Sequence, residues 1–310
     1  RATDRLGKGA RTPPRDAVIA DATRPDLRGR AFGYHRGMDH AGAVAGPLVA
    51  WVMIAGWNAT PVQVILGSAI PGVIAIAVVT WAMQLAGSEN GAGRVHWEAG
   101  DGRETASGKR ETQAPSTALL FGLIVAFAFA RFPETLLLLR MQELGVAVAL
   151  MPVAWGAMHL IRTAASYPGG WLSDRVGPRR TMLAGWLLYG GVCVGLATAE
   201  SGGVAFGWFL VYGLVAPATE APERAFIAAA AGRGRQGRGF GAYHASVGIA
   251  ALPGSLLFGA LYDRLGAGTA LLGSATVAGL LAIAAAVASA SRRQGRGRPS
   301  VAGRELAGDE

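Results

Sequence analysis

The chain has 310 residues, of which 51% are hydrophobic and 16% are charged, and its formal net charge is +9. This composition excludes an ordinary soluble domain and is typical of an integral membrane protein, in which each crossing needs about 20 apolar residues. The basic residues sit between apolar segments, so we do not expect nucleic acid to be a partner. The lone Cys193 lies within an apolar segment, and the sequence therefore predicts no disulfide, metal site or cofactor.

The predicted elements are membrane helices in two groups. Residues 1–86 are expected to hold the end of one helix, a basic turn at 22–30 and two further helices at 32–56 and 61–86. Residues 87–115 are Gly-rich and carry both charge signs, which indicates a polar linker. The tail at 292–310 is expected to be basic and disordered. Between linker and tail, the second group at 116–291 is expected to form a six-helix bundle, with spans near 117–139, 146–171, 182–199, 204–231, 240–261 and 269–290.

Basic loops alternate along the chain with loops that contain almost no Lys or Arg. The connections at 57–60, 142–145, 200–203 and 266–268 are nearly bare, whereas the others carry clusters of arginine. This alternation is the positive-inside pattern of membrane proteins. It predicts a multi-pass protein of the cell membrane (inner or plasma membrane) whose linker and C-terminus lie in the cytoplasm.

One segment of the first group recurs in the second group without a gap. Residues 14–33 align with residues 222–241, and nine aligned pairs are identical. These pairs are Pro14/Pro222, Ala17/Ala225, Ile19/Ile227, Ala20/Ala228, Ala22/Ala230, Gly29/Gly237, Arg30/Arg238, Phe32/Phe240 and Gly33/Gly241. Chance similarity between two Ala- and Gly-rich segments is the alternative. The repeat favours two related helical bundles, which is the build of a secondary transporter.

The loop between the second and third spans of the second group carries a charged motif. Its members are Gly170, Asp174, Arg175, Gly177, Arg179 and Arg180. An Asp at a helix end can accept N–H bonds from a neighbouring helix, and the arginines can hold one face of the protein in one conformation. The alternative is a solvated basic turn that only fixes the topology.

Two further motifs lie in the first group. Residues 1–9 carry an Arg followed by a Gly-x-Gly pair, in a helix rich in charges that should face a cavity or pair with one another. Gly42, Gly46 and Pro47 combine small residues at four-residue spacing with a helix-bending proline, which permits close helix approach. Helix packing alone would also explain these glycines.

On these motifs the chain resembles the major facilitator superfamily, from residue 1 to about 290. The resemblance implies an all-α polytopic membrane bundle with a two-bundle architecture. In that scheme the chain begins within the fourth transmembrane helix, residues 1–86 hold helices 4–6 and residues 116–291 hold helices 7–12. We therefore expect an N-terminally truncated fragment that lacks the first three helices and does not transport by itself.

Charged residues inside the spans are the candidates for the transport path. A carboxylate in an apolar setting disfavours its charge and can therefore bind and release a proton. Residues three or four apart share a helix face, so Arg36 with Asp39 or His40, and Glu220 with Glu223 or Arg224, form local polar patches. The candidates for proton or substrate contact are Glu220, Glu223, Asp39, Asp16, Glu134, Arg15, Arg36 and Arg224. For each of them, a purely structural ion pair is the alternative.

The function predicted from the sequence is secondary active transport of a small organic solute by alternating access, coupled to protons. The motif at Gly42, Gly46 and Pro47 favours efflux, because the resemblance associates it with exporters. The expected partners are the solute, protons and the lipid bilayer, and the expected state is a monomer. An intramembrane enzyme is not expected, because no nucleophile or metalloprotease motif is found in the sequence. A non-transporting receptor or scaffold with the same fold is the alternative.

Overall fold

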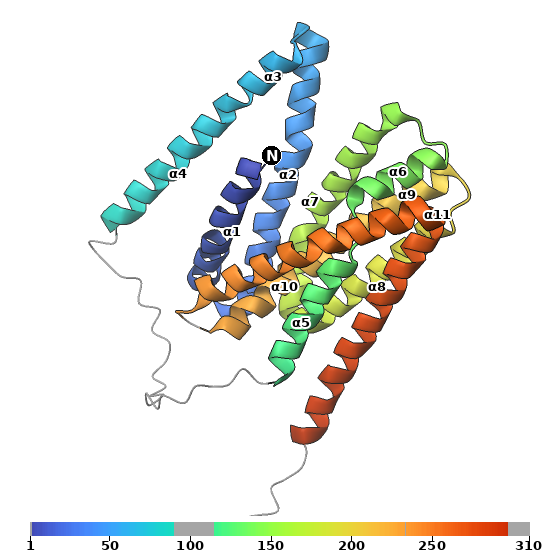
Figure 1. The fold of residues 1–310 in the computed structure, drawn as a ribbon. Coiled ribbons are helices and arrows are strands. Elements are labelled where there is room, and N and C mark those ends of the chain that lie inside the picture. Colours follow the sequence, from blue (N-terminus) through green and yellow to red (C-terminus); the bar gives the residue numbers. More distant parts are fainter. Residues whose placement is uncertain (1, 90–114, 233, 297–310) are drawn as a thin grey trace, which may run out of the picture. The chain divides into compact units, whose positions relative to one another are not determined.

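The computed structural model describes residues 2–89, 115–232 and 234–296, and these residues form helices and no strand (Figure 1). Most of the predicted linker and tail lies outside the described residues, but residues 87–89 of the linker and 292–296 of the tail, which was expected to be disordered, continue the preceding helices. The α-helices are α1 (Ala2–Ala22), α2 (Arg28–Trp57), α3 (Pro61–Gly67), α4 (Ala69–Glu89), α5 (Pro115–Ala130), α6 (Glu134–Glu143), α7 (Met151–Val176), α8 (Pro178–Ala197), α9 (Gly202–Tyr212), α10 (Val215–Ala231) and α11 (Gln236–Arg296), and two short 3₁₀ turns cover Pro25–Leu27 and Val148–Leu150.

The apolar helices confirm an all-α membrane protein. Among the described residues, five helical stretches are long and apolar enough to cross a membrane: Thr117–Glu143, Val148–Val176, Pro178–Ala197, Gly202–Ala231 and Gln236–Ala288. The last of these bends at Gly266, whose φ of 81° is not helical, so that it consists of two helical arms. The bend takes the place of the loop expected at 266–268.

Three spans that were expected to be continuous are interrupted. The span predicted at 117–139 breaks between α5 and α6, where Pro133 is extended and caps the start of α6. The span predicted at 204–231 breaks at Gly213 and Leu214, and the helix predicted at 61–86 is divided at Ser68. Each break removes backbone hydrogen bonds, which a membrane span can tolerate only where other groups replace them.

The break after α5 has such replacements from two other helices. The backbone N–H of Phe132 donates to the Tyr189 hydroxyl at 2.7 Å, and the Ser274 hydroxyl donates to the carbonyl of Ala130 at 2.7 Å. Tyr189 and Ser274 also hydrogen-bond to each other at 2.6 Å, and all of these groups are buried. Side chains of α8 and α11 therefore replace the backbone hydrogen bonds that are lost at the break, and the break lies within the core.

The described helices group into two compact units, Arg1–Val44 with Thr112–Glu310 and Ala45–Glu111. The division predicted from the sequence, with residues 1–86 as one bundle and 116–291 as another, stays a prediction. In the smaller unit, Thr60 caps α3 in a reciprocal box with Gln63, and the side chains of α3 and α4 are mostly exposed and apolar. Such surfaces suit lipid rather than water.

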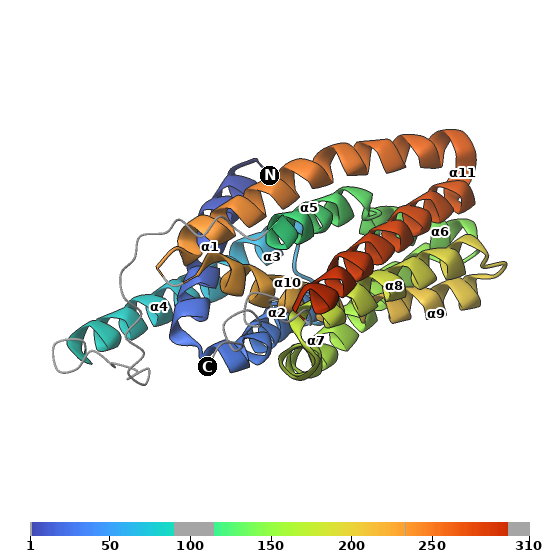
Figure 2. The same ribbon diagram turned by 90° about the horizontal axis from the view of Figure 1, so that it is seen from below.

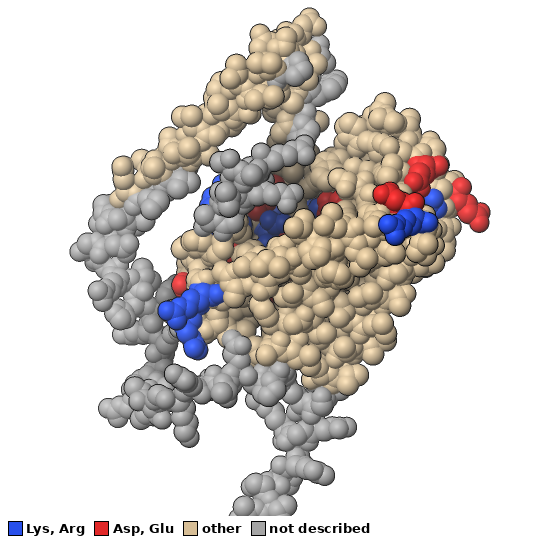
Figure 3. All heavy atoms as spheres, viewed as in Figure 1, with Lys and Arg blue, Asp and Glu red and all other residues tan. Residues whose placement is uncertain are grey.

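The larger unit contains the buried core. α5 lies between the two arms of α11 in both views (Figures 1 and 2) and contacts α11, which also packs against α8. Trp186 and Phe127 stack at 5.0 Å in this core. On the face shown in Figure 3, charged side chains gather in a few clusters, whereas most of the visible described surface is uncharged. An uncharged surface of this kind suits contact with hydrocarbon.

Candidate functional site

A buried carboxylate, Asp16, lies at the centre of a charged network formed by α1, α2, α10 and α11. Asp16 is fully buried, and its Oδ2 atom is 3.1 Å from Nε of Arg224 and 2.8 Å from Nε2 of His244. Arg15 also approaches it, with Nη2 at 3.4 Å from Oδ1. An ionised carboxylate is tolerated at such a depth only when cations or hydrogen bonds compensate it.

Residues that are equivalent in the internal repeat meet in this network. Asp16 aligns with Arg224 in the repeat, and the two side chains form an ion pair. Phe32 aligns with Phe240, and their rings lie 5.8 Å apart, both fully buried. Two pairs of positions that are equivalent in the repeat are therefore in contact, and one of these pairs lies within the charged network.

The network continues along α2 and α10. Arg36 forms an ion pair with Glu220, and its Nη1 atom is 3.0 Å from Oδ2 of Asp39. Arg224 donates from Nη1 to the carbonyl oxygen of Glu220 at 2.9 Å and also lies 3.8 Å from the Glu220 carboxylate. Arg15 reaches Asp39 at 3.8 Å. Six of the eight residues predicted for proton or substrate contact thus lie in one connected cluster. Positive and negative charges alternate along it.

Glu223 differs from the other carboxylates of the site. It is buried, and its Oε2 atom accepts a hydrogen bond from the Tyr243 hydroxyl at 2.7 Å. Among the described residues, no Arg, Lys or His lies within salt-bridge distance of it, although Arg131 and Arg224 are near enough to act on it through space. Its position, one turn from Glu220, places it beside the network without a direct cation.

Glu134 belongs to a second, adjoining group on α6, α7 and α9. Its Oε1 atom is 2.7 Å from Nη2 of Arg162 and accepts a hydrogen bond from the Tyr212 hydroxyl at 3.2 Å. The Arg162 guanidinium also lies over the Tyr212 ring, 5.3 Å from its centroid. The break between α5 and α6 places Glu134 in the first turn of α6, where the helix dipole favours a negative charge.

Two histidines join α2 and α7 next to these groups. The rings of His40 and His159 lie 5.3 Å apart, and both side chains are more than nine-tenths buried. His40 Nε2, His159 Nδ1 and Arg162 Nε have no hydrogen-bond partner among the described residues. Buried nitrogen atoms of this kind ordinarily find a partner in water or a ligand.

Asp174 connects the end of α7 to the start of α2. Its carboxylate accepts the backbone N–H groups of Gly29 and Arg30 at 2.6 and 3.0 Å, and the Arg30 side chain is 3.1 Å from it. The N-terminus of a helix carries a partial positive charge, so the carboxylate is stabilised by both the dipole and the arginine. The sequence motif predicted such a contact with a neighbouring helix, and the structure identifies α2 as that helix.

The rest of the charged motif lies around this contact. Gly170 approaches Gly29 so closely that a Cβ atom on either residue would collide with the backbone of the other, and Gly177 ends α7 with a φ of 100°. Arg175 lies 4.3 Å from the centroid of the Trp171 ring. The other two arginines, Arg179 and Arg180, begin α8 beside a cavity described below.

The motif of Gly42, Gly46 and Pro47 makes no contact among the described residues that would explain it. A Cβ atom built at Gly42 or at Gly46 would meet no described atom within 4 Å, and the side chain of Pro47 lies outside the description. A packing role for these residues stays a prediction. Within the described part of the chain, no group of three or more His, Cys, Asp or Glu residues could hold a metal ion.

Sequence reasoning missed the tyrosines of the site. Tyr212 and Tyr243 supply hydroxyl groups to Glu134 and Glu223, but neither was among the candidates. A tyrosine in an apolar span carries no signal that separates it from a packed aromatic residue. Arg162 is a polar residue in a span and could have been selected on that ground. The functional roles of all these residues stay predictions.

A comparison with known families decides what kind of protein this geometry belongs to. A family model described as Major Facilitator Superfamily matches residues 119–307, which is more than half of the chain. The chain belongs to the major facilitator superfamily. The family and the apolar helices together establish a multi-pass, all-α membrane protein of a transporter family.

Individual relatives agree with this family. The chain is similar to an uncharacterized MFS-type transporter of Methanocaldococcus jannaschii, with 28% identity over 287 residues, covering 90% of this chain and 69% of that protein. It is also similar to uncharacterized proteins of Mycobacterium bovis and Mycobacterium tuberculosis, with 27% identity over 266 residues, covering 84% of this chain and 63% of theirs. The matched part thus spans less than two thirds of the length of the mycobacterial relatives. It spans slightly more than two thirds of the length of the archaeal relative.

Proposed function

We propose that this member of the superfamily carries a small polar organic solute by alternating access and couples its movement to protons. The charged network supports this proposal. It joins α1 and α2 to α10 through Asp16, Arg36, Glu220 and Arg224 and to α11 through His244, and it contains Asp16 and Arg224, which are equivalent in the repeat. Ionic groups at membrane depth usually serve substrate or ion movement, and the sites of repeat-built transporters lie between their repeats.

The observation that carries proton coupling is the environment of Glu223. Its carboxyl group is buried and receives a single described hydrogen bond, from Tyr243, and no described cation pairs with it directly. Ionising such a group is costly unless the surroundings change. Glu223 can therefore hold a proton in the conformation described and release it when α10 and α11 move or water enters.

The contact of Asp174 with the start of α2 supports a gate on one side of the membrane. It joins α2 to α7 where basic residues cluster in the sequence, which we propose to be the cytoplasmic side. The carrier would then reside in the cell membrane with its C-terminus in the cytoplasm. Loss of this contact would separate the ends of α2 and α7 and give the site access to that side.

The cargo and the direction of transport follow from two smaller observations. Unpartnered nitrogen atoms of His40, His159 and Arg162 would offer donors to a solute that carries oxygen acceptors. The motif at Gly42 and Gly46 favours efflux through its likeness to exporters. We propose a monomeric carrier without enzymatic activity.

Flux into proteoliposomes tests this function. The protein expressed from its complete reading frame is reconstituted, and a panel of small organic solutes is measured with and without a pH gradient. We expect at least one solute whose flux follows the gradient. Glu223→Gln keeps a hydrogen-bonding group for Tyr243 but cannot release a proton, so its flux should lose the dependence on the gradient while exchange of solute persists.

The matched control is Glu143→Gln. Glu143 also accepts a hydrogen bond from a tyrosine, Tyr262 at 2.7 Å, but it lies outside the network and is 40% exposed. This variant should keep the response to the gradient. Absence of flux for the whole panel, together with specific binding of a partner protein, would instead support a receptor with this fold.

A further inference from the structure

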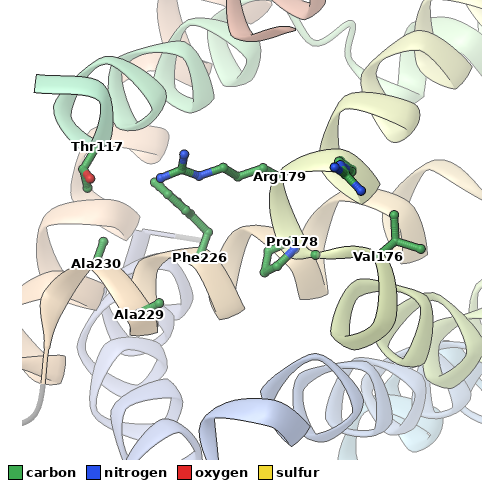
Figure 4. Close-up of a pocket in the computed structure, with 9 residues that line it drawn as sticks. Thr117, Val176, Pro178, Arg179, Phe226, Ala229 and Ala230 are labelled. Atoms are coloured by element: carbon green, nitrogen blue, oxygen red, sulfur yellow. The ribbon is translucent and has the colours of Figure 1, made fainter. Parts of the chain in front are cut away.

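A cavity of about 410 Å³ lies among the ends of four helices, apart from the charged network (Figure 4). It is lined by Thr117 at the start of α5, by Val176 at the end of α7, by Arg179 and Arg180 at the start of α8, and by Phe226 with its neighbours Ala229 and Ala230 near the end of α10. Its volume falls in the range of about 300–1,000 Å³ that is typical of small-ligand sites.

The charged side chains among the described lining residues are all positive. The described residues that line the cavity include two arginines and no Asp or Glu. The guanidinium of Arg179 lies 5.5 Å from the centroid of the Phe226 ring, and Figure 4 shows its side chain extending from α8 toward that ring and Thr117. A planar guanidinium held in this way can present two N–H groups to a phosphate, and a threonine hydroxyl can add a third donor.

The cavity lies where candidate membrane-spanning stretches begin and end. Its residues stand at or near the ends of four membrane-spanning stretches, which begin at Thr117 and Pro178 and end at Val176 and Ala231. Lipid headgroups occupy the same level. One part of the lining is basic and could bind a lipid phosphate. Another part, formed by Phe226, Ala229 and Ala230, is apolar and could contact an acyl chain.

We propose that this cavity binds an anionic phospholipid, with its phosphate at Arg179 and Arg180 and the start of its acyl region against Phe226. Basic pockets between transmembrane helices are suited to anionic headgroups. The apolar wall distinguishes a lipid from free phosphate, because free phosphate would gain nothing from it. The site also adjoins α7, whose Asp174 holds α2, so a bound lipid lies beside the proposed gate.

The test measures lipid binding to the purified protein in a neutral detergent by native mass spectrometry. The probes are dioctanoyl phosphatidylglycerol, dioctanoyl phosphatidylcholine and sodium phosphate. We expect phosphatidylglycerol to bind more tightly than phosphatidylcholine, and phosphate not to displace it. Arg179→Gln/Arg180→Gln should weaken phosphatidylglycerol binding by about 30-fold, since each basic residue near an anionic headgroup contributes about fivefold.

Two further variants separate this site from general attraction between charges. Arg235→Gln/Arg238→Gln removes the same charge from another basic loop that does not line the cavity, and it should change binding less than twofold. Ala229→Trp keeps both arginines but fills the apolar side of the cavity, and it should also weaken binding. Equal losses in the two charge variants, full competition by phosphate, or unchanged binding in Ala229→Trp would overturn the proposal.

Discussion

Glu134 and Arg162 form an ion pair outside the charged network. Arg162 is 5% exposed, and it is the cation closest to the Glu134 carboxylate among the described ion pairs. Arg162→Gln would leave Glu134, whose side chain is 21% exposed, with the Tyr212 hydroxyl as its described hydrogen-bond partner. Removing one partner of a fully buried pair costs about 3–5 kcal/mol, and partial exposure lowers this cost, so the unfolding temperature in detergent should fall by a smaller but measurable amount.

The double variant tests whether the loss comes from the uncompensated charge. Glu134→Gln/Arg162→Gln removes both charges and retains amides that can hydrogen-bond to each other. Its unfolding temperature should lie closer to that of the wild type than to that of Arg162→Gln, because replacing both charges costs much less stability than removing one. If the double variant is as unstable as the sum of the two single variants, the pair is not coupled in the way described.

The sequence predicted part of the charged site at the level of single residues. Helix-face spacing brought Arg36 together with Asp39, and the structure agrees. The pairing of Asp16 with Arg224 was not predicted, although the two positions align in the repeat. Contacts over 208 residues depend on how helices pack, and no local spacing encodes them.

At the scale of elements, the approach of α2 to α7 depends on two glycines. A Cβ atom on Gly170 would collide with the carbonyl of Gly29 and lie 3.1 Å from the Arg30 nitrogen, where Asp174 accepts its hydrogen bonds. Gly170→Ala should therefore separate the helix ends and lower stability by about 1–3 kcal/mol, the usual cost of overpacking. Thermal unfolding in detergent measures this effect.

Gly156→Ala is the matched control on the same helix. A Cβ atom at Gly156 meets nothing within 4 Å among the described atoms. Alanine is favoured over glycine in a helix by about 1 kcal/mol, so this variant should be neutral or more stable. Equal destabilisation by the two substitutions would mean that the close approach of α2 and α7 does not contribute to stability.

Helix existence was predictable from the sequence, but helix interruptions were not. Long apolar runs predicted the spans because hydrocarbon requires them. The break at Pro133 is compensated by Tyr189, which is 57 residues from its partner Phe132, and by Ser274, which is 144 residues from its partner Ala130. A membrane helix can also continue through a proline, as α10 does at Pro222, so proline alone does not predict where a span is divided.

At the scale of the whole molecule, the internal repeat is the most informative feature of the sequence. It predicted two related sets of helices, and the meeting of Phe32 with Phe240 shows that equivalent positions are neighbours within the larger unit. Two residues that support the repeat, Gly29 and Arg30, take part in the contact made by Asp174. A carrier in which related helices move against each other would use this region as its gate.

The most direct test of this account follows the distance between α2 and α7 by double electron–electron resonance. Spin labels are placed at the exposed positions Tyr34 and Leu172, in a protein whose lone Cys193 is replaced by alanine. The wild-type contact predicts a main population at short distance. Asp174→Asn should transfer population to longer distances, because it weakens the bond to Arg30 and the start of α2. An unchanged distance distribution in Asp174→Asn would contradict the account, since the two helices would then be joined without depending on that carboxylate.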